Sequence, residues 1–134
     1  MANPNIAALT TIKGQTAYVV PSTTAATVSW TYDGSTALTG LTPAANTVNK
    51  LTGLIVSNTT ASAAYATVGV GNNATFGSAT VIGYVAYQIS VPANASLIVV
   101  DKTTDLYITE NQSVGVTSGT ASALTYTAIF EVIT

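Results

Sequence analysis

Apolar and polar residues alternate along much of this chain, and no window shows a sustained helical period. The clearest example is Thr27–Tyr32, where Val28, Trp30 and Tyr32 share one face and hydroxyl side chains occupy the other. Two longer runs have the same character: one places Val81, Val85, Tyr87, Ile89 and Val91 on a common face, and the other places Leu124, Tyr126, Ala128, Phe130 and Val132. β-branched and aromatic residues dominate these runs, as a pleated, half-buried surface prefers. The pattern predicts a chain of strands, with no helix longer than about two turns.

Shorter runs and the turns between them predict the architecture. Further strands are expected at Ala17–Val20, Leu51–Ser57, Ala63–Val70, Ser96–Val100, Asp105–Glu110 and Gln112–Thr117. Turn-forming pairs such as Asp33-Gly34 and Ser118-Gly119 separate them, and Gly34–Asn46 and Gly71–Ala79 are interpreted as loops that cross between sheets. Turns about 8–12 residues apart are typical of antiparallel sandwiches and barrels. We therefore expect an all-β, two-sheet antiparallel sandwich, jelly-roll or immunoglobulin-like, with about eight or nine strands.

The amino-terminal segment does not obviously belong to that core. Asn3-Pro4-Asn5 favours an extended entry, and Pro4 cannot donate to a sheet ladder. We expect residues 15–134 to form one sandwich domain, and Met1–Gly14 to be an edge strand of it or an arm that pairs with a neighbouring subunit. The opening has neither the basic region nor the apolar run of a signal peptide. No apolar stretch approaches the ~20 residues that span a bilayer, so we expect no membrane partner.

The composition excludes most kinds of catalysis, metal binding and phosphate binding. The 134 residues include no His, no Cys and no Arg. The charged side chains are Lys13, Asp33, Lys50, Asp101, Lys102, Asp105, Glu110 and Glu131. His and Cys supply most proton transfer near neutral pH and most transition-metal ligands, and Arg is the usual bidentate clamp for phosphate. Three cationic side chains cannot neutralise a phosphate backbone. We therefore expect no enzymatic activity, no catalytic, cofactor-binding or metal-binding residues, and no nucleic-acid partner.

Two groups of residues suggest ligand-binding sites, and each also has a simpler structural interpretation. Asp101, Asp105 and Glu110 form the one acidic cluster, which suggests a Ca²⁺ site or a charged turn that keeps a strand end soluble. The EF-hand spacing is absent, and nothing marks the carboxylate pair of a glycosidase, so the charged turn is favoured. The Tyr residues could stack on sugar rings, but Tyr84 and Tyr87 are expected on opposite faces of one strand. Packing in the core or in an interface is the favoured role for the Tyr residues.

Several segments resemble a known class of proteins. They are Met1–Ile6, Leu54–Asn58, Val91–Lys102 and Leu106–Val114, and Gly34–Asn46 departs from the pattern. These segments resemble small virion structural proteins of tailed phages, especially those of marine cyanobacteria. The resemblance implies a capsid decoration, a neck or tail component, or part of a fibre, made in the host cytoplasm and located in the virion. It carries no enzymatic residues over to this chain.

The low charge agrees with a structural role. Charged residues make up 6% of the chain, against roughly 25% in soluble domains, and the formal net charge is -2. Contacts between uncharged groups tolerate salt, and short Thr and Ser side chains lose little rotamer entropy on docking. A surface of this kind lacks the usual protection against association. We expect a homo-oligomer, a trimer, that binds the major capsid protein or other virion proteins as a decoration or cement protein. A neck, tail or fibre component and a carbohydrate-binding, adhesin-like module remain as alternatives.

Overall fold

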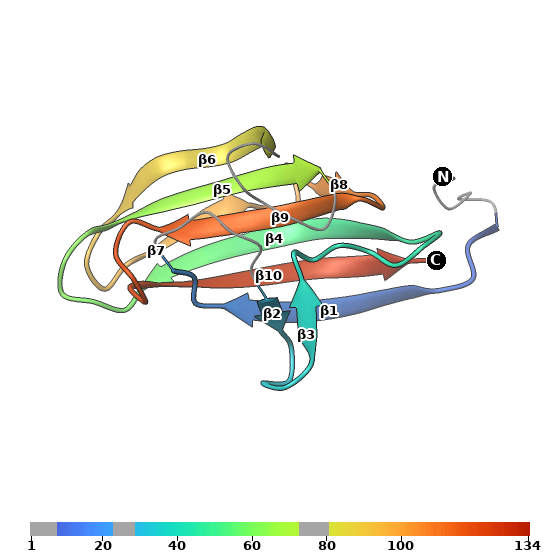
Figure 1. Cartoon of the computed structure of the whole chain (residues 1–134), viewed down its shortest axis with the longest axis horizontal. Coiled ribbons are helices and arrows are strands. Elements are labelled where there is room, and N and C mark those ends of the chain that lie inside the picture. The colour runs from blue at the N-terminus through green and yellow to red at the C-terminus, as the bar shows by residue number, and fades with distance from the viewer. Residues whose placement is uncertain (1–7, 23–28, 73–80) are drawn as a thin grey trace.

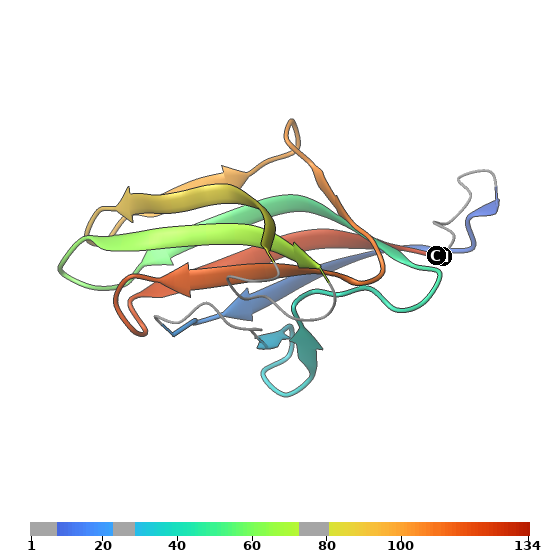
Figure 2. The ribbon, with the colours of Figure 1, turned by 45° about the horizontal axis from the view of Figure 1, so that its top comes forward.

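The computed structural model describes residues 8–22, 29–72 and 81–134, and they form two antiparallel sheets (Figure 1). The larger sheet has the order β3-β2-β1-β10-β4-β7, with β8 also paired to β4, and the smaller has the order β6-β5-β9. The strands are β1 (Ile12–Val19), β2 (Ser29–Thr31), β3 (Ala37–Thr39), β4 (Val48–Asn58), β5 (Ala64–Asn72), β6 (Val81–Val91), β7 (Ser96–Val100), β8 (Leu106–Ile108), β9 (Gln112–Ser118) and β10 (Leu124–Ile133). Figure 2 shows the smaller sheet lying over the larger one. The predicted all-β sandwich is confirmed.

The core lies between the sheets and follows the alternation in the sequence. Leu124, Tyr126, Ala128 and Phe130 of β10 are buried as predicted, while Val132 is half-buried at the edge of the core. The other residues of the core cluster include Leu54 and Val56 of β4, Ala66 and Val68 of β5, and Val114 and Val116 of β9. Side chains from the two sheets therefore interdigitate as in an aligned sandwich. No helix in the described ranges is long and apolar enough to cross a membrane.

The long central strand β4 organises the larger sheet. It pairs with β10 along one side, with β7 at one end of the other side and with β8 at the other end. β10 in turn pairs with β1 over eight residues, from Ile12↔Ile133 to Val19↔Tyr126. Long ladders therefore hold the centre of this sheet together, with one register shift between Ile129 and Phe130 in the β10–β4 pair and one between Leu54 and Ile55 in the β4–β7 pair.

The start of the described chain is tied to its end. Ile12–Gly14 belong to β1 and pair with β10, and the main-chain N–H of Thr10 donates to the Thr134 carbonyl at 2.8 Å. Met1–Ala7 lie outside the described residues. An arm that leaves the sandwich is therefore confined to residues that precede Thr10.

One short strand, β3, lies in a stretch that the sequence predicts to be a loop. The predicted loop Gly34–Asn46 contains β3, which pairs with β2 and places the half-buried Leu38 opposite the buried Trp30. β3 makes the described strands ten in number rather than eight or nine. A three-residue strand has too few positions to show alternation, which is why the sequence carries no signal for it. Thr27, Val28 and residues 73–79 lie outside the described ranges.

The predicted face of β6 is wrong, although the strand itself is present. Of Val81, Val85, Tyr87, Ile89 and Val91, only Val91 is buried. The register between β5 and β6 shifts between Ala66 and Val68, between Val68 and Gly69, and between Val70 and Gly71. Each shift inserts an extra residue into β6, and each extra residue moves the following side chains to the other face. The simple alternation in the sequence therefore does not correspond to one side of this edge strand.

Candidate interaction surfaces

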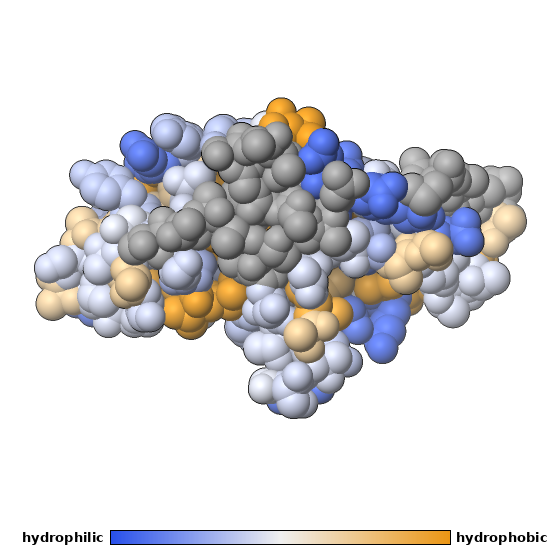
Figure 3. Space-filling model, viewed as in Figure 1, coloured by the Kyte–Doolittle hydropathy of each residue, from blue (hydrophilic) through white to orange (hydrophobic). Residues whose placement is uncertain are grey.

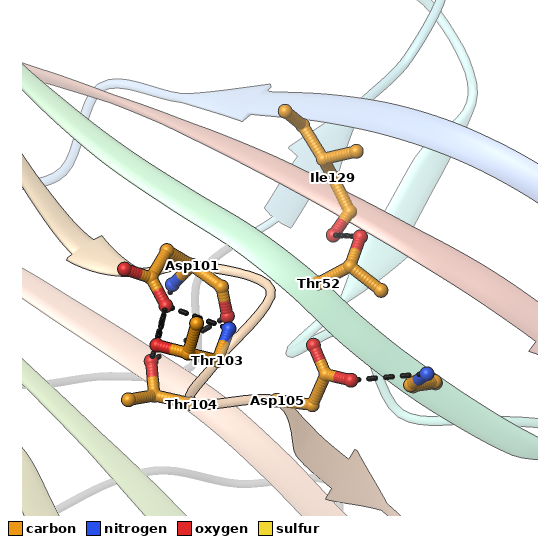
Figure 4. Close-up of polar contacts among 7 residues, drawn as sticks. Thr52, Asp101, Thr103, Thr104, Asp105 and Ile129 are labelled. Carbon is orange, nitrogen blue, oxygen red and sulfur yellow. Dashed lines mark hydrogen bonds and ion pairs between the residues drawn. The ribbon is translucent and has the colours of Figure 1, made fainter.

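The acidic residues of the predicted turn separate into three different environments. Asp101 begins the β7–β8 connection, and its Oδ1 accepts hydrogen bonds from the Thr103 N–H at 2.8 Å and the Thr103 hydroxyl at 2.6 Å (Figure 4). These bonds hold the pKa of Asp101 below its usual value because they favour the ionised carboxylate. Glu110 instead accepts from the main-chain N–H of Asn46 in a distant loop. Across the described part of the chain, no group of three or more His, Cys, Asp or Glu side chains could hold a metal ion.

Asp105 takes part in the ion pair at one end of the larger sheet. Its Oδ2 lies 3.0 Å from Lys50 Nζ, and this hydrogen-bonded contact raises the Lys50 pKa. Lys50 also lies 5.9 Å from the ring centroid of Tyr107, and its register partner in β10 is Glu131. Charge on the outer face of the larger sheet is thereby gathered at the β8 end.

The rest of that outer face is uncharged. A continuous row crosses four neighbouring strands in register, through Tyr18 of β1, Thr127 of β10, Ile55 of β4 and Ile98 of β7. The sequence neighbours of Tyr18, Thr127 and Ile55 are core residues, namely Ala17, Tyr126, Leu54 and Val56. The neighbours of Ile98, Leu97 and Val99, pack against that core, so the whole row points outward. Ile98 is 65% exposed and Tyr18 is 46% exposed. We call this row, with the adjoining Ile129, Ser57 and Ser96, the hydroxyl–apolar face.

Local contacts join the strands of the hydroxyl–apolar face. Ile129 pairs with Gly53, and a Cβ at Gly53 would lie 3.2 Å from the Ile129 Cδ1, so the isoleucine occupies the space that a side chain would need. The Thr52 hydroxyl donates to the Ile129 carbonyl at 3.2 Å (Figure 4). The Ser57 and Ser96 hydroxyls are 2.9 Å apart and join β4 to β7. Figure 3 shows separate hydrophobic patches at the surface, one at the top near β6 and others along the lower edge near β1.

The outer face of the smaller sheet has a different chemistry. Tyr84 and Tyr87 of β6 lie with their ring centroids 4.8 Å apart in an edge-on arrangement, which corrects the expectation that they point to opposite faces. Tyr84 and Tyr87 are three positions apart, so regular alternation would place them on opposite faces. The extra β6 residue between the pairs Gly69↔Tyr84 and Val68↔Ala86 brings both side chains to the same face. Both rings are at least half exposed, as is that of Tyr65 on β5.

A polar depression of about 340 Å³ lies beside these rings. It is lined by Tyr65, Thr67, Gln88, Thr117, Ser118 and Gly119. The main-chain N–H of Gln88 donates to the Thr67 hydroxyl oxygen at 3.1 Å, and that of Gly119 donates to the Tyr65 carbonyl at 2.8 Å. Gln88 has a φ of 48°, in the left-handed region that costs an ordinary residue about 1–2 kcal/mol. Sequence reasoning missed this site, because no glycine marks the left-handed position at Gln88.

A second recess of about 410 Å³ is lined by no residue of the smaller sheet. It is lined by Lys13, Gln15, Leu38, Leu41, Thr42, Pro43, Ala44, Thr47, Asn49, Phe130, Val132 and Thr134. Asn49 is buried there, and its side-chain N–H₂ donates to the Leu41 carbonyl at 2.8 Å. Its Oδ1 has no hydrogen-bond donor among the described groups. The recess is mainly apolar, with one ammonium and several amide or hydroxyl groups at its walls.

Comparisons with family models, with curated proteins and with solved structures found no match to this chain. The chemistry of the surfaces above therefore carries the argument about function.

Proposed function

We propose that this protein is a virion structural protein of a tailed phage, a decoration or cement protein that binds the outer capsid lattice. The docking surface in this proposal is the hydroxyl–apolar face, and its partner is the major capsid protein. The observation that carries the proposal is the outward-facing row Tyr18–Thr127–Ile55–Ile98, which contains no charged residue. The side chains at its two ends, Tyr18 and Ile98, are exposed, and the two between them are half-buried. The strands that bear Ile55 and Ile98 also carry two of the segments, Leu54–Asn58 and Val91–Lys102, that resemble phage structural proteins.

The physical properties of the face suit a permanent contact. Ile, Thr and Ser lose little rotamer freedom on docking, in contrast to the Lys and Glu side chains of ordinary surfaces. Burial of uncharged groups depends weakly on ionic strength, whereas exposed ion pairs are screened by salt. The one ion pair among the described side chains, Lys50–Asp105, lies outside the row. Attachment through this face should therefore persist in high salt.

Oligomerisation is part of the proposal. In the described part of the chain, β1 pairs with β2 only at Tyr18↔Thr31, and β6 has a neighbour on one side only. Unpaired strand edges invite association unless another chain covers them. We propose a homotrimer whose subunits cover the β1 edge, with residues that precede Thr10 reaching a neighbouring subunit or the shell. Mass photometry of the full chain should show a trimer. In shell-binding and thermal-melting assays, a variant that lacks Met1–Ala8 should bind the shell less tightly than the full chain yet melt normally.

The docking face is tested with two isoleucines of nearly equal exposure. Ile98 on the hydroxyl–apolar face is 65% exposed, and Ile82 on β6 is 61% exposed. Ile98→Glu should strongly reduce binding to shells assembled from the major capsid protein, whereas Ile82→Glu should leave the affinity nearly unchanged. Wild-type binding should also change little between low and high salt. Equal effects of the two substitutions would contradict the assignment of the face.

Location in the particle separates decoration from the alternative structural roles. Reconstruction of virions should show density for this protein at many equivalent positions over the shell. Density restricted to a ring at the portal vertex, or to the tail, would replace the decoration proposal with a neck or tail component.

A further inference from the structure

The outer face of the smaller sheet carries a surface that the docking proposal does not use. It combines the exposed rings of Tyr65, Tyr84 and Tyr87 with the polar depression that contains Gln88 and Thr117. In a sandwich the outer faces of the two sheets point in opposite directions (Figure 2). A subunit that docks through the hydroxyl–apolar face therefore presents this tyrosine surface away from the contact.

The groups around the depression are suited to hydroxyl-rich ligands. The Gln88 side-chain amide offers both a carbonyl acceptor and N–H₂ donors, and the Thr117 hydroxyl can donate and accept. Neither of these side chains hydrogen-bonds to the described residues. The Thr67 hydroxyl oxygen already accepts from the Gln88 N–H, so its own proton is available for an acceptor on a ligand. Mixed donors and acceptors at short spacing match a ring that bears several hydroxyl groups.

Aromatic rings complete the match. A tyrosine ring offers an apolar face and a polar tip, so it can pack on the C–H face of a sugar while hydroxyl groups bond around it. Tyr65 lines the depression and is 57% exposed, which leaves ring surface available for stacking. The paired rings of Tyr84 and Tyr87 extend the aromatic surface along β6. No charged side chain lines the depression, so a neutral ligand is favoured over an acidic one.

The site is also held in a defined shape. A Cβ at Gly119 would lie 3.1 Å from the Tyr65 Cβ, so the absence of a side chain at Gly119 lets Tyr65 occupy its position. The Gly119 N–H fixes the Tyr65 carbonyl at 2.8 Å. Gln88 keeps a left-handed conformation, with φ of 48°, on a bulged edge strand, and strained residues of this kind concentrate at functional sites.

We infer that the depression beside Tyr65 is a binding site for a neutral sugar, with Tyr65 as the stacking ring and Gln88 as the hydrogen-bonding amide. A proline-rich peptide also binds exposed aromatic residues, but it prefers an aromatic-lined apolar groove. The depression is instead largely polar, with hydroxyl and amide groups in its walls. The inference does not depend on capsid docking, because it uses only residues of β5, β6, β9 and the turn after β9.

The test uses the full chain and an array of neutral and acidic glycans, followed by titration calorimetry with the best neutral sugar. Tyr65→Ala should weaken binding about five- to tenfold, the typical effect of losing one stacking contact or hydrogen bond. Tyr107→Ala is the matched control, because Tyr107 is 59% exposed but lies on the larger sheet. It should bind the sugar as the wild type does.

Gln88→Gly separates the amide from the backbone. Glycine accepts a positive φ without strain, so this variant should melt at the wild-type temperature or above it and still lose sugar affinity. This variant also keeps the inference testable if Tyr65→Ala fails to fold. Absence of any neutral-sugar binding by the wild type would overturn the inference. So would equal affinities of the Gln88→Gly and Tyr107→Ala variants, or a preference of the site for proline-rich peptides or acidic sugars.

Discussion

Gly40 provides a sharp test of the way in which the two sheets are joined. It follows β3 with a φ of +61°, and its carbonyl accepts a hydrogen bond from the Val114 N–H of β9 at 2.7 Å. A Cβ built at this position would lie 2.7 Å from the Ser113 Cβ, closer than side chains can approach. Gly40→Ala therefore adds a steric clash and a left-handed alanine at the same point.

The expected cost follows from these two terms. A left-handed conformation costs an L-residue about 1–2 kcal/mol, and overpacking a filled site costs about 1–3 kcal/mol. Reduced entropy of the unfolded chain offsets about 0.4–1 kcal/mol of this. The net loss should be about 1–4.5 kcal/mol, with a middle value near 3 kcal/mol, compared with the ~5–15 kcal/mol that stabilises a typical domain. For a domain of this size the melting temperature should fall by roughly 4–16 °C.

Two other glycines supply controls for the separate terms. Gly34 has a φ of +83°, but a Cβ added there would have no neighbouring atom within 4 Å, so Gly34→Ala should show the backbone cost alone, about 1 kcal/mol. Gly14 has neither a positive φ nor a close neighbour, so Gly14→Ala should be neutral or slightly stabilising. Calorimetric melting and urea unfolding of the three variants measure the series. If Gly40→Ala is no more destabilising than Gly34→Ala, the close contact between the β3 turn and Ser113 does not exist.

Three further predictions concern ionisation and the core. Burial raises the pKa of Tyr126, whose hydroxyl donates to the Thr117 carbonyl at 2.8 Å. The stability that this neutral phenol contributes is therefore complete below pH ~10 and is lost as the pH rises above that value. Tyr126→Phe should be less stable by about 1 kcal/mol at neutral pH but show a flatter urea-midpoint profile above pH ~10. Hydrogen bonds from Thr36 and Ser35 hold the pKa of Asp33 far below its usual range, and those from Thr103 lower that of Asp101. The stability that these two ionised carboxylates contribute is present above pH ~4 and is lost as pH falls. A combined Asp33→Asn, Asp101→Asn variant should therefore lose less stability on acidification than the wild type. The stability of the wild type should be nearly constant between about pH 5.5 and 9. Leu54 is fully buried, and Leu54→Ala should cost about 2–5 kcal/mol in urea unfolding, whereas a loss below 1 kcal/mol would contradict its place in the core.

The strands of the core were predictable because their alternation reports burial directly. In β10 each buried side chain alternates with one that is less buried, from Leu124 to Phe130. The sequence pattern therefore predicts both that this segment is a strand and which of its side chains face the core. β7 was predicted with its observed bounds, Ser96–Val100. Short β3 carried no such signal, since three residues cannot define a period and its pairing with β2 is a tertiary contact.

The aromatic surface was not predictable, because it depends on where β6 departs from regular pairing. Residue order alone places Tyr84 and Tyr87 on opposite faces, and the bulge between them reverses that result. No glycine marks the left-handed position at Gln88, so the usual sequence signal for a bulge is absent. Pairing with β5 decides the geometry of this edge strand, and pairing is information that a single sequence does not contain.

The two proposed surfaces should be separable in one molecule. Ile98 lies on the outer face of the larger sheet and Gln88 on the edge strand of the smaller sheet, with the core between the two faces. Substitutions at distant sites that share no partner act independently. Ile98→Glu should therefore abolish shell binding and leave sugar affinity unchanged, whereas Gln88→Gly should do the reverse, and the double variant should show both losses without an additional fall in melting temperature. If Ile98→Glu also weakened sugar binding, the two activities would share one surface, and the division of roles between the two sheets would be wrong.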